Sequence, residues 1–107
     1  MKISTSTDKL TKYYGDEVAI KKFAQAGFQA LDFGMFYPVD DWRFQLSEDE
    51  FIKYFSSLKT AALQNGIEIG QTHSPMVNYI YTGDEVPGNI YLDAQIKAIH
   101  ATALLGA

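Results

Sequence analysis

The 107-residue chain contains no cysteine, only three prolines and no long hydrophobic run. The absence of cysteine excludes a disulfide framework and any thiolate chemistry. No apolar run approaches the length that is needed to cross a membrane, and residues 1–6 lack the apolar core of a signal peptide. We therefore expect a cytoplasmic protein without a membrane partner.

Basic side chains are few as well, and they do not gather in one part of the chain. Nine Lys and Arg stand against thirteen Asp and Glu, which gives a formal net charge of −4. A protein that binds a phosphate backbone usually carries a cluster of basic side chains. We therefore do not expect nucleic acid as a partner of these residues, although a basic surface elsewhere in a longer protein would change this.

Apolar and aromatic side chains, in contrast, are abundant. Hydrophobic residues make up 47% of the sequence, and they include seven Phe, seven Tyr and one Trp. This content is too high for a disordered segment, and a chain of this length can bury one core but hardly two. We expect a single domain over residues 1–107.

Three glycines, Gly27, Gly66 and Gly106, lie about 40 residues apart, and each ends a stretch with apolar residues at helical spacing. Glycine is favoured just after a helix because it adopts the left-handed backbone conformation that closes the last turn. Strand-like runs follow the first two glycines, and another opens the chain. The predicted strands are residues 2–6, 28–33 and 67–72, in units of about 1–27, 28–66 and 67–106.

The predicted order is βαβαβα, an α/β fold. A helix between two successive strands requires those strands to be parallel. A polar loop is expected over residues 7–15, and Ser47 with Glu50 predicts a capping box at the second helix. The core-facing side chains that we expect in the three helices are Val18, Ala19, Phe23, Ala24, Ala26, Phe51, Tyr54, Phe55, Leu58, Ala62, Leu63, Leu92, Ile96, Ile99, Ala103 and Leu104.

The predicted loops are unequal in length. Those from helix to strand are about one or two residues long, whereas those from strand to helix run to about nine, thirteen and sixteen residues. The long loops all lie at the carboxyl ends of the strands, where open α/β sheets and (β/α)8 barrels alike place their sites. Their aromatic side chains either pack on each other or line a ligand pocket. These aromatic residues are Tyr13, Tyr14, Phe36, Tyr37, Trp42, Phe44, Tyr79 and Tyr81. Among them we select Phe36 and Trp42 as candidate substrate-binding residues.

His73 comes directly after the third predicted strand, where we expect the site. Its imidazole can contact a substrate, bind a metal or fix the loop beside Pro75, and the sequence leaves these three roles open. If the strand alternates regularly, Ile67, Ile69, Gln71 and His73 share one face. We take His73 as a third candidate substrate-binding residue.

Asp32 lies near the end of the second strand, between two apolar residues. A carboxylate there is costly to bury unless it is paired or hydrogen-bonded. It either orients His73 from the neighbouring strand or is satisfied by loop amides, and it is the fourth candidate substrate-binding residue. The adjacent Asp40 and Asp41 are interpreted as a turn or a helix cap in preference to metal ligands. We assign no catalytic residue and no metal ligand within the chain.

With these positions in place, the chain resembles the N-terminal part of the xylose isomerase-like (β/α)8 barrels. This group contains sugar and sugar-phosphate isomerases and epimerases, and it also includes the type-2 AP endonucleases. The resemblance implies that the chain forms the first three units of a TIM (β/α)8 barrel and that a fourth strand follows. Its most specific part is His73-Ser74-Pro75. The other matching segments are residues 1–4, 26–33, 65–67 and 105–107.

The resemblance implies a full-length isomerase or epimerase that moves a proton next to a carbonyl with the help of a divalent metal, Mn, Mg, Co or Zn. The metal ligands and catalytic carboxylates of such proteins come mostly from later strands. We therefore expect no metal on this segment and no activity from it alone. The implied partner is a sugar or sugar phosphate. Among the residues of the family's site, only the histidine of the third strand has a counterpart in this chain, His73.

Two alternatives stay open. In the endonuclease branch, the histidine that corresponds to His73 binds zinc, so the chain could belong to a metal-dependent hydrolase of the AP endonuclease type. The chain could instead be a non-catalytic truncated fragment. A three-strand part of a barrel leaves two strand edges unpaired, and we then expect self-association.

Overall fold

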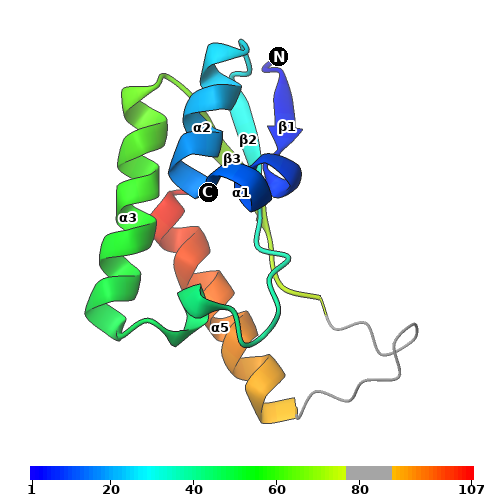
Figure 1. Ribbon diagram of the computed structural model, residues 1–107, viewed down its shortest axis with the longest axis vertical. Helices are drawn as coiled ribbons and strands as arrows, with labels where there is room; N and C mark the ends of the chain where they lie inside the picture. Colours follow the sequence, from blue (N-terminus) through cyan, green and yellow to red (C-terminus); the bar gives the residue numbers. More distant parts are fainter. Residues whose placement is uncertain (77–87) are drawn as a thin grey trace.

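A computed structural model of the protein describes residues 1–76 and 88–107 (Figure 1). The elements are β1 (Ser4–Ser6), α1 (Asp8–Tyr14), α2 (Asp16–Gln25), β2 (Ala30–Gly34), the 3₁₀ helix η1 (Trp42–Gln45), α3 (Glu48–Gln64), β3 (Glu68–His73) and α5 (Gly88–Leu105). The strands form one parallel sheet in the order β1-β2-β3, so the predicted α/β class is confirmed. Among these residues, no helix is both long and apolar enough to span a membrane.

The hydrophobic core lies between one face of the sheet and the helices α2, α3 and α5 (Figure 1). The middle strand contributes Leu31 and Phe33, whose side chains are fully buried. Because successive residues of a strand point to opposite faces, Asp32 between them lies on the other face. We call this other side of the sheet, which carries Asp32, the polar face.

Glycines close the helices as their spacing predicts. Gly27, Gly66 and Gly106 have φ angles of 93°, 68° and 80°, a left-handed conformation in which a side chain would be strained. The capping box that was predicted at the start of α3 is also present, with Ser47 and Glu50 bonded to each other's backbone N–H groups.

The prediction of a polar loop over residues 7–15 is wrong, because most of these residues form α1. This helix has only seven residues, which is too short to be stable alone or to show a clear apolar period. Tertiary contacts at its start hold it in place. The Thr7 N–H donates to the Asp32 carbonyl at 3.0 Å, and the Thr7 hydroxyl accepts from the Gly34 N–H at 3.1 Å.

The expected core face of the third helix is also wrong. α5 packs on the protein through small residues and one leucine: Ala94, Ala98, Ala101 and Leu105. Several residues expected in the core are exposed: Val18, Ala26, Leu63, Leu92, Ile96, Ile99 and Ala103. Both stripes of α5 are apolar and have helical spacing, so periodicity cannot choose between them. Small side chains allow a helix to lie close to its neighbours, which favours the alanine stripe at the contact with α3 and the sheet.

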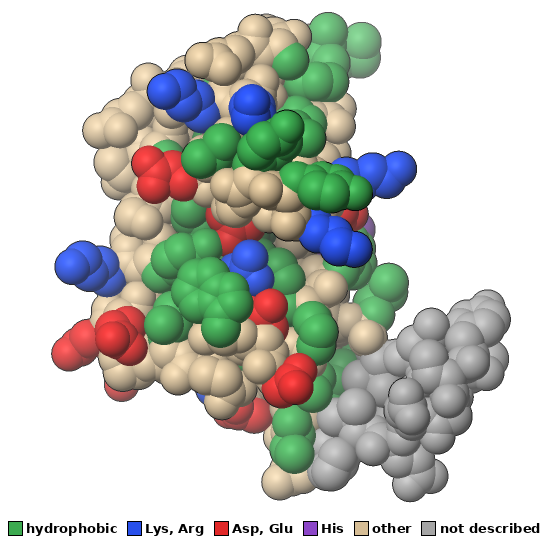
Figure 2. All heavy atoms as spheres, viewed as in Figure 1, with side chains coloured by type: hydrophobic (Ala, Val, Ile, Leu, Met, Phe, Trp, Pro, Cys, Tyr) green, Lys and Arg blue, Asp and Glu red, His purple; other side chains and the backbone are tan. Residues whose placement is uncertain are grey.

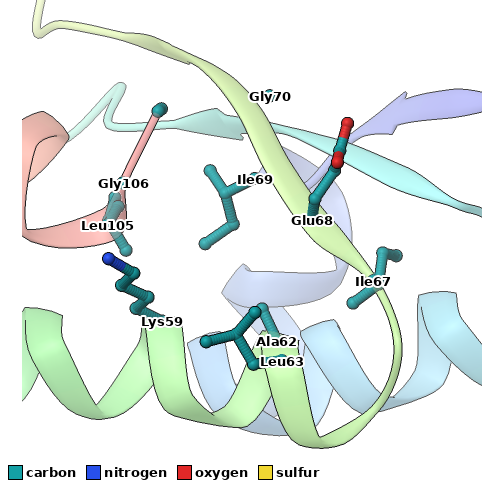
Figure 3. Close-up of a pocket in the computed structure, with 10 residues that line it drawn as sticks. Lys59, Ala62, Leu63, Ile67, Glu68, Ile69, Gly70, Leu105 and Gly106 are labelled. Atoms are coloured by element: carbon teal, nitrogen blue, oxygen red, sulfur yellow. The ribbon is translucent and has the colours of Figure 1, made fainter.

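The expected alternation in the third strand is wrong because β3 contains a β-bulge. Ile69 and Gln71 pair with consecutive residues of β2, so Gly70 between them has no partner in that strand. Ile69 points toward α3 and is buried (Figure 3). Gln71 and His73 lie on the polar face, where both are hydrogen-bonded to Asp32.

We predict that Ala98→Leu lowers the free energy of unfolding by about 1–3 kcal/mol, because the added methyl groups overpack the contact of α5 with the core. Ala98 is 1% exposed. The same substitution at the exposed Ala103 is the control, and it should change stability by about 0.5 kcal/mol or less. Urea unfolding followed by circular dichroism measures both. A larger loss at Ala103 would mean that the helix presents the face expected from the sequence.

Candidate functional site

The candidate site lies on the polar face, at the carboxyl ends of β2 and β3. A hollow on this face is lined by residues of all three strands, among them Ser6, Asp32 and Gln71. Ser6, Asp32 and Gln71 are polar residues of this lining, which also includes Ala30, Leu31 and Gly70, and backbone pairing within the sheet positions them. The base of the site is therefore formed by paired strands, the kind of scaffold on which ligand sites are usually built.

Asp32 and His73 form the central pair of the site. His73 Nδ1 and Asp32 Oδ1 are 2.7 Å apart, so of the two roles that the sequence left open for Asp32, the contact with His73 from the neighbouring strand is the one that the structure forms. An ionised carboxylate can only accept a hydrogen bond, so Nδ1 carries the hydrogen. In the neutral ring, Nε2 is then the nitrogen without a hydrogen. The side chains of His73 and Asp32 are 46% and 20% exposed, so solvent and ligands can reach the imidazole.

Phe36 lies beside this pair. The centroids of the Phe36 and His73 rings are 5.3 Å apart and the ring planes differ by 31°. The backbone N–H of the buried Met35 donates to the His73 carbonyl at 2.8 Å, which continues the pairing of β2 and β3 and keeps the two rings together. Phe36 is 41% exposed and adds an apolar surface to the polar site. Three of the four candidate residues are therefore in one place.

Trp42 is not part of this group. Its ring packs edge-on against Tyr54 of α3, with centroids 5.1 Å apart, and lies 4.9 Å from the Arg43 guanidinium. Figure 2 shows hydrophobic side chains with basic and acidic neighbours over the region of η1. Trp42 is thus explained by packing in this region, and the structure does not bring it to His73. The loop residues Tyr79 and Tyr81 lie outside the described residues.

Sequence reasoning missed a second polar group, the Arg43 cluster (Asp16, Asp41, Arg43 and Tyr54). Arg43 Nε donates to Asp16 at 2.9 Å and Arg43 Nη1 donates to Asp41 at 2.9 Å. The Tyr54 hydroxyl also donates to Asp16, which is only 3% exposed. The cluster joins α2, η1 and α3 and thereby fixes the loop that carries Phe36. Asp41 also caps η1 by accepting from the Arg43 N–H, which agrees with its interpretation as a cap.

Asp8 is a further acidic residue near the site that the sequence did not single out. Its Oδ2 accepts from the Ser6 hydroxyl at 2.8 Å. Its Oδ1 lies so close to Gly34 that a Cβ on that glycine would be 1.6 Å from the oxygen. Glycine is therefore required at this position if the carboxylate is to stay at the end of β2.

Comparisons of the chain with protein-family models, with curated proteins and with solved structures found no match. An imidazole that is held through Nδ1 can accept a hydrogen bond or a proton at Nε2, or bind a metal there. The aromatic ring beside it can cover an apolar surface of a ligand.

We predict that Tyr37, which packs against Arg43, makes folding sensitive to alkaline pH. Burial, and next the charge of Asp16, raise the pKa of the Tyr37 phenol above its ordinary value of about 10. The unfolded chain then loses this proton at lower pH than the folded protein does, so stability that is present below about pH 10 is lost as the pH rises further.

The test is urea unfolding of Tyr37→Phe between about pH 8 and about pH 11. The variant should lose less stability with pH than the unsubstituted protein, while Tyr54, whose pKa burial also raises, keeps part of the dependence. Tyr13→Phe is the matched control because Tyr13 is 77% exposed, and it should leave the pH dependence unchanged. An identical pH dependence in all three proteins would show that Tyr37 is not the responsible group.

Proposed function

We propose that the three strand–helix units are the first three of a (β/α)8 barrel. The strands follow chain order across the sheet, without the reversal that marks an open doubly wound sheet. The helices α2, α3 and α5 pack on the same face of the sheet (Figure 1), as in the outer ring of a barrel, whereas an open sheet has helices on both faces. The polar face then corresponds to the barrel interior.

The outer edge of β3, which no strand of residues 1–76 and 88–107 pairs with, supports the same proposal. A pocket beside it is lined by Lys59 and Leu63 of α3, by Ile69, and by Leu105 and Gly106 at the end of α5 (Figure 3). A fourth parallel strand would begin in this pocket, and the next helix would cover the exposed stripe of α5. In the absence of such a unit, the same edge and stripe are the surfaces through which we expect self-association.

Within this barrel, the chain forms part of the substrate site of a sugar or sugar-phosphate isomerase or epimerase. The observation that carries this proposal is the imidazole of His73, held by Asp32 beside the ring of Phe36. A sugar has hydroxyl groups, which can donate to an imidazole nitrogen, and a face of C–H groups, which can pack on an aromatic ring. In this site, the imidazole of His73 can accept from a hydroxyl group and the ring of Phe36 can cover the C–H face.

A divalent metal is also implied by the resemblance, but the residues of the site do not form a binding place for one. Within residues 1–76 and 88–107, no group of three His, Asp or Glu side chains is arranged to hold a metal ion. Both carboxylate oxygens of Asp32 already accept hydrogen bonds. The described residues are therefore assigned to substrate binding and not to metal binding.

The first test is sugar binding to the 107-residue chain, followed by ¹H–¹⁵N NMR. A ketose or ketose phosphate should shift the amide signals of His73 and Phe36. His73→Ala should weaken binding about tenfold, because an unsatisfied polar group costs about 1–3 kcal/mol. Trp42→Ala is the control and should bind as tightly as the unsubstituted chain, since Trp42 lies outside the site. An equal loss of sugar affinity in both variants would contradict the proposed site. Shifts of the amide signals that are confined to Trp42 would contradict it as well.

The second test uses the full-length barrel protein that the proposal implies. It should interconvert at least one member of a panel of ketoses and ketose phosphates, with a lower kcat/KM in His73→Ala. Failure on the whole panel would refute the isomerase or epimerase proposal. Zinc-dependent nicking of abasic DNA in its place would support the hydrolase alternative.

A further inference from the structure

The bulge at Gly70 decides which side chains of β3 belong to the site. In a regular strand that starts from the buried Ile69, Gly70 and Thr72 would face the polar side, and Gln71 and His73 would face the helices. The unpaired Gly70 shifts this alternation by one residue. Consistent with the shift, the hydroxyl of Thr72 lies 2.7 Å from that of Thr102 in α5, on the helix side.

As a result, Gln71 and His73 meet the same carboxylate from one strand. The Gln71 Nε2 donates to Asp32 Oδ2 at 2.8 Å, while His73 Nδ1 donates to Asp32 Oδ1 at 2.7 Å. The main chain of Asp32 is fixed as well, because its carbonyl accepts from the Thr7 N–H at 3.0 Å. The rotation of the carboxylate about its side-chain bonds is therefore determined by Gln71 and His73 together.

We propose that Gln71 is a positioning residue of the site, which orients Asp32 so that the carboxylate keeps His73 in the Nδ1–H form. This inference rests on the proposed function only in regarding His73 as a ligand-binding group. Without Gln71, Asp32 can rotate and its hydrogen bond to the imidazole weakens. The neutral ring then gains freedom to place its hydrogen on Nε2.

The arrangement also defines what the site offers to a ligand. When Nδ1 carries the hydrogen, Nε2 is an acceptor, and the Gln71 Oε1 is a second acceptor because its amide nitrogen faces Asp32. Two acceptors on side chains that both contact Asp32 suit a ligand with two hydroxyl donors. They suit a phosphate oxygen poorly, so in a sugar phosphate the hydroxyl end would lie here.

The test measures the imidazole tautomer of His73 in the 107-residue chain by long-range ¹H–¹⁵N NMR at about pH 8, which is above the ordinary pKa of a histidine side chain. His73 should be mainly in the Nδ1–H form. In Gln71→Leu, the ratio of the Nδ1–H to the Nε2–H form should fall about two- to tenfold. This is the change in an equilibrium constant that the loss of one hydrogen bond typically causes. Gln71→Lys keeps a donor for Asp32 and should restore the ratio.

Two controls separate positioning from a general loss of structure. Thr72→Val alters the neighbouring residue on the helix side and should leave the His73 ratio unchanged. His100, which lies in α5 with its ring 5.5 Å from Phe51, should give the same signals in every variant. Gln71 is exposed, so its variants should retain the dispersed amide spectrum of the folded chain.

The outcomes distinguish this inference from the proposed function. An unchanged ratio in a folded Gln71→Leu variant, or a His73 ring in the Nε2–H form in the unsubstituted chain, would overturn the role of Gln71. Neither measurement requires a substrate. If the tautomer results hold but no sugar binds, the positioning role stands and the proposed function fails.

Discussion

The burial of Leu31 and Phe33 in the middle strand is the constraint on which the rest of the structure depends. Both side chains are fully enclosed between the sheet and the helices, and this contact is worth about 1.5–3 kcal/mol for each. The strand cannot shift by one residue without exposing them and burying Asp32. The position of Asp32 on the polar face is thus a consequence of core packing, and the polar site follows from it.

Stability and site chemistry are divided between different parts of the molecule. The helix side of the sheet carries the apolar core, and the Arg43 cluster connects α2, η1 and α3 through charges that are largely removed from water. Such a pair is costly to break because one charge would be left buried. The polar face contributes few apolar contacts, so His73 and Gln71 can be arranged for a ligand at little cost to the core.

The arrangement of the helices bears directly on the proposed barrel. A sheet that packs α2, α3 and α5 on one side leaves its other side to be filled by side chains or to receive a ligand. Here that side carries Ser6, Asp32, Gln71 and His73 toward the carboxyl ends of the strands. Polar residues at this end and apolar packing on the opposite face agree with a site at the mouth of a barrel.

The sequence alone determined the order of the units, because glycine at a helix end and apolar periodicity are local signals. It also pointed to His73 and Asp32, since the carboxyl ends of parallel strands meet at one edge. Only the tertiary structure decided which stripe of α5 is buried, whether Trp42 joins the site, and how the bulge at Gly70 places Gln71 beside Asp32. These features depend on contacts between residues far apart in the chain, which no local pattern records.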